Sequence, residues 1–221
     1  MQRGDDLHVT TNLAASDLNV NRETQAVEQG TEASRRWDRD MRVITFRPLE
    51  QTDTEVLSRL FARLSEESLY RRFMSPVHRL DQVHLRRLLD IDHKDREAII
   101  GLLGGEAIGV GRYARTASAS AEFAVVVADR FQRLGVAGEL LSRLAILALA
   151  RGITEFTFTA HSENLPIIGL VRKLVKDPTL KFTGPEVEGR FEIIDLAHYS
   201  PGYPVRELDD QAGAGARMEK A

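Results

Sequence analysis

The chain has 221 residues, which fits one domain of roughly 150 to 170 residues with tails, or two very small domains. Its 43% hydrophobic and 29% charged residues are typical of a globular protein and exclude wholesale disorder and a collagen-like fibre. A net charge of −3 argues against a nucleic-acid binder that works by counterion release. The chain has no cysteine, so disulfides, thiolate nucleophiles and Cys-based metal sites are excluded.

Membrane and export signals are missing from the pattern. The most apolar stretch, residues 144–150, is far shorter than the ~20 residues that span a bilayer. The first 20 residues carry acidic and polar groups where a signal peptide has an apolar core. We therefore expect a soluble, cytoplasmic protein with neither a membrane nor a nucleic-acid partner.

The two ends of the chain differ in composition from its middle. Residues 1–40 have few large apolar side chains and cannot bury enough apolar surface to offset the entropy of ordering. From about residue 200 the chain again becomes rich in proline, glycine and small residues. The sequence predicts a mobile tail over 1–40, a globular domain over 41–199 and a flexible tail over 200–221.

The first half of the domain is predicted to form a strand, two helices and a hairpin. Thr52 is followed three residues later by Glu55, which is the pattern of a capping box at a helix start. Gly104-Gly105 separates two apolar runs and is typical of a tight hairpin turn. The expected strands span 42–46, 97–103 and 107–113, and the expected helices begin after Thr52 and at Gln82.

The second half carries stronger signals. Residues 122–128 are β-branched and nearly all apolar, as in a strand buried on both faces. Residues 135–151 have a helical apolar stripe, with Gly152 placed to end the helix. After these come an expected strand over 154–160, a helix over 164–173 with Pro166 in its first turn, and a hairpin with strands over 180–182 and 190–196.

This order of elements is β-α-α-β-β-β-α-β-α-β-β. Three consecutive strands are expected to form an antiparallel meander, and the strand–helix–strand unit after it is expected to pack in parallel. The predicted fold class is therefore α/β (α+β), with a mixed, mostly antiparallel central sheet and helices on both faces.

Residues 129–138 join the strongest strand to the strongest helix. A glycine-containing turn that opens directly into a helix presents N–H groups without intrahelical partners at the positive end of the helix dipole, which suits a pyrophosphate. Gly135, Ala137 and Gly138 allow a phosphate to approach the backbone closely, and Arg133 adds a positive charge. An ordinary turn with a glycine explains the same residues, so the pattern by itself leaves both interpretations open.

The segment Gln-Arg-Leu-Gly-Val-Ala at 132–137 resembles the Gln/Arg-x-x-Gly-x-Gly/Ala signature of the GCN5-related N-acetyltransferases, the GNAT family. The resemblance covers about residues 42–196. It implies a GNAT fold with acetyl-CoA as co-substrate, whose pyrophosphate binds the turn and whose pantetheine arm pairs with the preceding strand. By this resemblance the cofactor-binding residues are Val125, Val126, Val127, Gln132, Arg133, Leu134, Gly135, Val136, Ala137, Gly138 and Asn164.

A second resemblance is narrower. Residues 64–73, Leu-Ser-Glu-Glu-Ser-Leu-Tyr-Arg-Arg-Phe, are similar to the Leu-Ser-x-Glu-Ser-x-x-x-Arg-Phe stretch of bacterial Pat-type protein lysine acetyltransferases. Asp95-Arg96-Glu97 is also similar to that subgroup. Some members are fused to a cyclic-nucleotide-binding domain, which the forty residues of the predicted N-terminal tail are too few to form.

Acetyl transfer to an amine needs a base, because lysine is protonated at pH 7. The resemblance implies that Glu122, at the start of the strand beside the pantetheine, is this base, and the apolar run after it is expected to raise its pKa. A solvated glutamate at a strand edge is the alternative. His161 is a second candidate base, although a surface or capping histidine is the more ordinary account.

Other polar residues have ordinary structural explanations beside the functional ones. Asn164 either contacts the pantetheine or caps the helix that follows it. The tyrosine acid that many family members carry seven residues later is replaced by Val171. The pairs Arg71-Arg72 and Arg86-Arg87 are expected to lie on solvated helix faces. No metal site is expected, because His78, His84, His93 and His198 lack ligand spacing with carboxylates.

The predicted activity is acetyl-CoA-dependent N-acetyl transfer by direct attack of an amine, assisted by a general base. A protein lysine side chain is the first hypothesis for the acceptor. A small amine is the second hypothesis, and a non-catalytic module that senses acyl-CoA is the third.

Overall fold

The computed structural model describes residues 44–77, 79–197 and 206–207. The predicted N-terminal tail and most of the predicted C-terminal tail lie outside the described residues, as do His78 and His198. The limits of the globular domain at 41 and 199 therefore stay a prediction.

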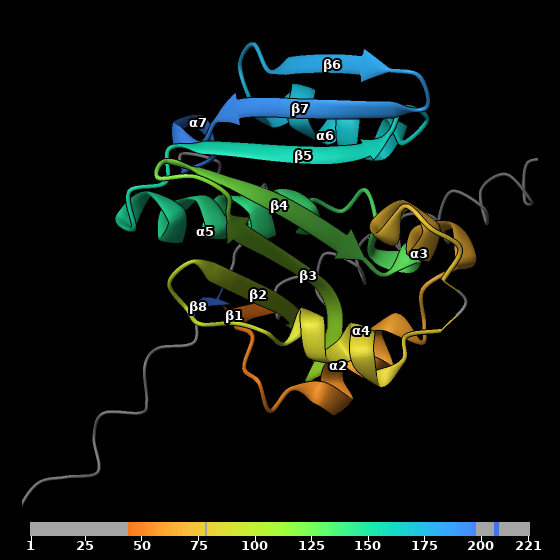
Figure 1. The fold of residues 1–221 in the computed structure, drawn as a ribbon. Coiled ribbons are helices and arrows are strands. Elements are labelled where there is room, and N and C mark those ends of the chain that lie inside the picture. Colours follow the sequence, from red (N-terminus) through yellow and green to blue (C-terminus); the bar gives the residue numbers. More distant parts are fainter. Residues whose placement is uncertain (1–43, 78, 198–205, 208–221) are drawn as a thin grey trace, which may run out of the picture. The chain divides into compact units, whose positions relative to one another are not determined.

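One eight-stranded sheet forms the centre of the described part, with strand order β6-β7-β5-β4-β3-β2-β1-β8 (Figure 1). The strands are β1 (Ile44–Pro48), β2 (Arg96–Leu103), β3 (Glu106–Arg115), β4 (Ser120–Val127), β5 (Glu155–His161), β6 (Thr179–Thr183), β7 (Glu186–Glu192) and β8 (Arg206–Glu207). The helices are α2 (Thr54–Phe61), α3 (Glu66–Phe73), α4 (Gln82–Leu88), the 3₁₀ turn η1 (Asp129–Phe131), α5 (Val136–Ala150), α6 (Leu165–Leu174) and α7 (Ile194–Ala197).

The pairing of the strands confirms the predicted sheet. Strands β1 to β4 pair antiparallel in chain order, and β5, β7 and β6 pair antiparallel in turn. The contacts of β4 with β5 and of β1 with β8 are parallel. The β2–β3 turn is formed by Gly104 and Gly105 with φ of 58° and 83°, the left-handed backbone that a tight hairpin turn requires.

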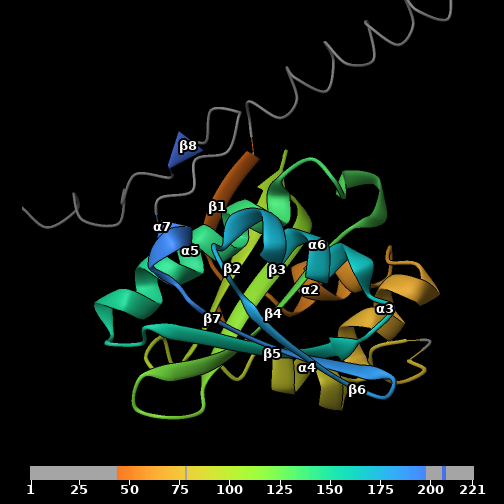
Figure 2. The same cartoon turned by 90° about the horizontal axis from the view of Figure 1, so that it is seen from above.

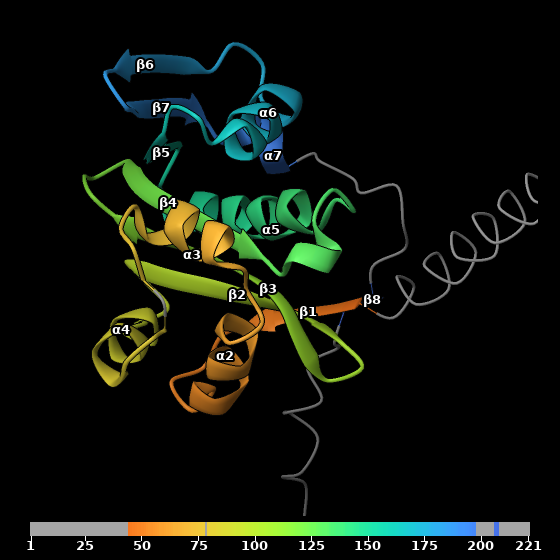
Figure 3. The same cartoon turned by 90° about the vertical axis from the view of Figure 1, so that its right-hand side faces the viewer.

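Helices cover both faces of this sheet, as predicted (Figures 2 and 3). α5 packs on one face through Leu140 and Leu144, which are fully buried. A Cβ atom on Gly111 of β3 would lie 3.0 Å from a methyl carbon of Leu144, so a glycine there allows the helix to approach closely. α2 and α4 pack on the opposite face, and α3 lies near β4.

Aromatic rings fill the core at the β4–β5 junction. Phe123 of β4 contacts Phe156, Phe158 and Phe191, with ring centroids 5.4 to 5.7 Å apart. These side chains join the parallel pair to the C-terminal hairpin, so the start of β4 is held firmly in place.

The predicted capping box is wrong. α2 begins at Thr54, and its N-cap residue is Asp53, whose carboxylate makes no capping hydrogen bond. That carboxylate instead forms a bidentate ion pair with Arg47, at 2.6 and 2.7 Å, and accepts a hydrogen bond from the backbone of Glu50. Charge-assisted bonds to a residue on the preceding strand outcompete the local cap.

Other elements also differ from the prediction, among them α3 and α7. α3 was not expected, because its eight residues are mostly polar and bury only Ser68 and Leu69. The strand predicted over 190–196 ends at Glu192, and the short helix α7 begins at Ile194. Ile193 and Leu196 are fully buried and three residues apart, which is a helical spacing that an apolar run of this length conceals.

Candidate active site

Strands β4 and β5 pair over three residues only and then separate. Ser120, Ala121 and Glu122 are in parallel register with β5, whereas β4 stays paired with β3 as far as Val127. Figure 1 shows the two strands spreading apart toward the end near α3. The backbone groups of residues 123–127 that face β5 have no ladder partner there. An extended ligand arm can pair with such an edge, as an added strand does.

Beyond the opening, the chain turns into α5 through two left-handed residues, Arg133 with φ of 64° and Gly135 with φ of 85°. The first hydrogen bond of the helix runs from Glu139 N–H to the Gly135 carbonyl, at 3.1 Å. The N–H groups of Val136, Ala137 and Gly138 therefore have no acceptor within the helix. This is the geometry that binds phosphate at a helix N-terminus, and the donors needed for a pyrophosphate are present.

The side chains of the turn have separate positions. Arg133 is exposed, Leu134 is half-buried, and Val136 is buried in the core. Val136 therefore offers only its backbone to a ligand, whereas Arg133 is free to approach a phosphate.

Gln132 joins the turn to two other elements. Its amide nitrogen donates one hydrogen bond to the carbonyl of Val127 and another to Ser68 Oγ, each at 3.1 Å. The first bond fixes the end of β4 and the second reaches α3. The side chain of Gln132 therefore organises the turn, a role that the family signature by itself does not specify.

Asp129, at the start of the turn, completes this network. Its carboxylate accepts hydrogen bonds from Ser65 Oγ at 2.6 Å, from Ser68 Oγ at 2.8 Å and from the backbone N–H of Ser65 at 2.9 Å. Burial opposes ionisation of Asp129, but these hydrogen bonds outweigh it and lower its pKa below the ordinary value. The two serines of the Pat-like segment therefore attach α3 to the turn before α5.

Glu122 occupies the last paired position before the strands separate, opposite Thr157 of β5. Its side chain is exposed, so the apolar residues that follow it in β4 do not enclose it, contrary to the sequence-based expectation. Side chains alternate along β4, so Phe123 and Val125 lie on the α5 face, whereas Glu122 and Ala124 lie on the opposite face, which carries α3. The carboxylate is accessible to an amine arriving from solvent.

Asn164 lies after β5, at the start of α6, and caps that helix. Its side-chain oxygen accepts a hydrogen bond from the backbone N–H of Ile167 at 3.4 Å, and the residue is 8% exposed. The capping role is thus present, while contact with the pantetheine stays a prediction. Val171, at the position of the family's tyrosine, is buried in the core.

His161, the second candidate base, stacks on Tyr70 of α3 with ring centroids 4.7 Å apart. Its Nε2 atom is buried without a hydrogen-bond partner among the described residues. The ring therefore belongs to a contact between β5 and α3, which explains the residue without a catalytic role.

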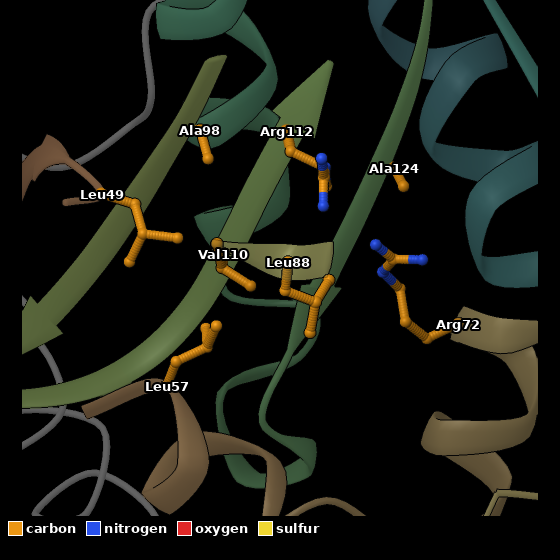
Figure 4. Close-up of a pocket in the computed structure, with 8 residues that line it drawn as sticks. All are labelled: Leu49, Leu57, Arg72, Leu88, Ala98, Val110, Arg112 and Ala124. Atoms are coloured by element: carbon orange, nitrogen blue, oxygen red, sulfur yellow. The ribbon is translucent and has the colours of Figure 1, made fainter. Parts of the chain in front are cut away.

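The arginine pairs are only partly as expected. Arg86 and Arg87 are exposed, and Arg71 forms an ion pair with Glu67 one helical turn away. Arg72 is different, because its guanidinium points into a pocket on the α2–α4 face of the sheet, together with that of Arg112 from β3 (Figure 4). No sequence pattern indicates that Arg72 and Arg112 meet, because they lie forty residues apart and on different elements.

The Asp95-Arg96-Glu97 segment is structural. Glu97 is 2% exposed and pairs with Arg151 at 2.9 Å and with His93 at 2.9 Å. Asp95 pairs with Arg115 at 2.7 Å. These ion pairs lie at the opposite end of the β2–β3 hairpin from its Gly-Gly turn and connect it to the end of α5.

The described residues contain no group of three or more His, Cys, Asp or Glu side chains arranged to hold a metal ion. None of the helices they form is long and apolar enough to cross a membrane.

Comparison with known proteins identifies the family. The model of the acetyltransferase (GNAT) family matches residues 61–174. An acetyltransferase of Pseudomonas aeruginosa is 31% identical over 130 residues, which cover 57% of this chain and 70% of that protein. Together with the opening beside β4 and the turn before α5, these matches define an N-acetyltransferase that uses acetyl-CoA. The chain belongs to the GNAT family.

Solved structures agree with this assignment. The GNAT domain of S. lividans PAT is 32% identical, with a TM-score of 0.62, and the match covers 66% of this chain and 89% of that domain. The PaiA N-acetyltransferase of Thermoplasma acidophilum, solved in complex with coenzyme A, has a TM-score of 0.53 at 15% identity, covering 67% of this chain and 98% of that one. The second match supports the fold alone.

Proposed function

We propose that this enzyme acetylates a lysine side chain of a protein, with Glu122 as the general base. The observation that carries the proposal is the position of Glu122 at the last paired residue before β4 and β5 separate. A carboxylate at that point lies beside the backbone edge proposed to pair with the pantetheine arm. A protein acceptor is supported by the Pat-like residues 64–73 and by the likeness to the GNAT domain of S. lividans PAT.

The residues of this chain divide the work as follows. Backbone N–H groups of Val136, Ala137 and Gly138, with Arg133, hold the pyrophosphate, and the free edge of Val125 to Val127 aligns the pantetheine. Bound acetyl-CoA supplies the activated acetyl thioester. Glu122 accepts a proton from the lysine ammonium, so that a neutral amine attacks. The new N–C bond forms as the C–S bond breaks, and the nitrogen releases its excess proton to solvent water to give the neutral amide.

The departing thiolate takes its proton from water. Val171 offers no hydroxyl at the position where many family members carry a tyrosine acid, and a coenzyme A thiol has a pKa close enough to neutrality for water to suffice. In this proposal the amide nitrogen of Asn164 donates to the acyl end, while its oxygen accepts the hydrogen bond of the helix cap.

The test is mass spectrometry of lysine acetylation in a cytosolic extract supplied with acetyl-CoA, with and without the enzyme. A rise at discrete lysines above chemical background supports a protein acceptor and names it. Acetylation of small amines alone, in a parallel panel of polyamines and amino acids, would overturn the protein acceptor while keeping the transferase. Acetyl-CoA binding, followed by calorimetry, with no transfer to any amine would favour a sensor.

A further inference from the structure

Arg72 and Arg112 bring two positive charges into one pocket (Figure 4). The pocket is shallow: its enclosed part has room for about one water molecule, and the rest is open to solvent. Apart from the two arginines its lining is aliphatic: Leu49, Leu57, Leu88, Ala98, Val110 and Ala124. Both arginines are half-buried, and two positive charges brought into one pocket repel each other unless an anion lies near them.

The part of the chain that the structure describes supplies no such anion within bonding distance. The Arg72 guanidinium makes no hydrogen bond or ion pair there, and its close neighbour is the Phe73 ring, 5.1 Å away. Arg112 donates one hydrogen bond, to the carbonyl oxygen of Arg87 at 3.0 Å. Most of the N–H donors of both groups are therefore available to a ligand.

Both groups are nevertheless charged at neutral pH. Burial lowers the pKa of Arg72 to about 10, and the charge of Arg112 contributes in the same direction. Burial also lowers the pKa of Arg112. The negative charge of Asp90 raises that pKa, and the positive charge of Arg96 lowers it. Planar guanidinium groups bind a carboxylate through two parallel hydrogen bonds, so two such groups at the mouth of one pocket suit a carboxylate.

The pocket lies next to the proposed base. Arg112 is in register with Ala124, and Ala124 and Glu122 are two residues apart on the same face of β4. Two residues of a strand span about 7 Å. The charge of Glu122 also acts on Arg72, which shows that these side chains share one electrostatic environment.

We propose that Arg72 and Arg112 bind a carboxylate of the acceptor, so that the enzyme prefers an amine that also carries a carboxylate close to the reacting nitrogen. This inference rests on the proposed function of Glu122. The carboxylate belongs either to an acidic residue beside the target lysine or to a free amino acid, and the chemistry recognised is the same.

A binding experiment tests the pocket without turnover. Calorimetric titration compares 6-aminohexanoate with its amide, 6-aminohexanamide, which keeps the amine and removes the negative charge. We expect the acid to bind about 10-fold to 100-fold more tightly, the range for hydrogen bonds to a charged group. The preference should fall toward one in Arg72→Gln and Arg112→Gln and stay unchanged in Arg71→Gln, whose side chain pairs with Glu67 instead.

Equal binding of the acid and the amide by the wild-type enzyme would overturn the inference. So would a preference that survives in both pocket variants, provided that each still binds acetyl-CoA and is therefore folded. Arg72→Lys adds a further check, because it keeps the charge but not the planar pair of donors, and we expect it to recover only part of the preference.

Turnover assays distinguish the source of the carboxylate. One pair of acceptors is a lysine peptide with flanking glutamates and the same peptide with glutamines; the other is free lysine and lysinamide. A higher kcat/KM for the glutamate peptide than for the glutamine peptide indicates that the carboxylate belongs to a protein acceptor. A higher kcat/KM for free lysine than for lysinamide indicates a free amino acid. Transfer at equal rates within both pairs would refute the inference and leave the proposed function standing. If the wild-type enzyme transfers acetyl to none of these acceptors, the proposed function is wrong. The binding titration then still tests whether the pocket binds a carboxylate.

Discussion

Ser68 and Asp129 are 61 residues apart in the chain, yet the Ser68 hydroxyl donates a 2.8 Å hydrogen bond to the Asp129 carboxylate. The same hydroxyl accepts a hydrogen bond from Gln132. Ser68 therefore connects α3, which carries Arg72, to the turn that holds the pyrophosphate donors. Together with Ser65, which also bonds to Asp129, this side chain holds the acceptor side and the cofactor side of the proposed site in fixed relation.

The Asp129 network predicts a pH dependence of stability. The pKa of Asp129 is lowered in the folded state, so its contribution to stability is present above the ordinary aspartate pKa of about 3.9 and is lost as the pH falls through the lower folded value. Asp129→Asn should therefore unfold at lower urea concentration than the wild type at pH 7, and this difference should shrink at pH 3. Asp177→Asn, at an exposed site, is the matched control and should show no such difference. A gap between Asp129→Asn and the wild type that is equal at both pH values would refute the assignment.

Replacement of the proposed base should slow catalysis without weakening cofactor binding. Glu122→Gln keeps the size and exposure of the side chain but cannot accept the proton, so we expect kcat at pH 7 to fall by about 10² to 10⁴. The dissociation constant for acetyl-CoA, measured by calorimetry, should change little. Glu192→Gln, at an exposed position of β7, provides a control of the same chemistry. Unaltered turnover in Glu122→Gln would remove Glu122 from the mechanism.

The phosphate-binding turn can be tested with two glycines of equal backbone strain. Gly135 has φ of 85° and is the N-cap residue before α5, whereas Gly152 has φ of 74° and lies after the end of that helix. An alanine in this left-handed region costs about 1 to 2 kcal/mol at either site. Gly135→Ala should also weaken acetyl-CoA binding, because it alters the N–H donors, while Gly152→Ala should lose only stability. Equal affinity in the two variants would mean that the turn does not bind the phosphates.

The buried ion pair of Glu97 and Arg151 should matter for stability far more than an exposed one. Arg151→Met leaves the Glu97 carboxylate, which is 2% exposed, without its main counter-charge, and we expect the free energy of unfolding to fall by about 3 kcal/mol. Arg190→Met breaks an exposed pair with Glu155 and should cost less than about 1 kcal/mol. Urea denaturation of both variants measures the difference, and similar losses would contradict it.

Local signals predicted much of the fold and part of the site. Some features follow from the backbone preferences of residues that are neighbours in sequence. They are the apolar run of β4, the helical stripe of α5 and the glycines at 104, 105, 135 and 152. For this reason the strand, the turn and the helix of the cofactor site could be recognised from residues 122–152 alone. Glu122 was likewise proposed as the base from its place in that strand and from the family resemblance.

Other features required the tertiary structure. α3 is short and polar, so its helix depends on the Ser65 cap and on contact with Asp129 rather than on an apolar stripe. Thr52 was expected to cap α2, but the N-cap residue is Asp53, whose carboxylate pairs with Arg47 of β1. The exposure of Glu122 also depends on which face of the sheet it occupies and on which helix covers that face.

The sequence by itself determined the family, the order of the main strands and helices, and the turn that suits a pyrophosphate, because these rest on preferences of contiguous residues. Only the tertiary structure decided that β4 and β5 separate after Glu122, that Ser68 bonds to Asp129, and that Arg72 meets Arg112 in one pocket. Each of these depends on groups brought together from distant parts of the chain. Such distances are fixed by packing of the whole sheet and its helices, which no local pattern specifies.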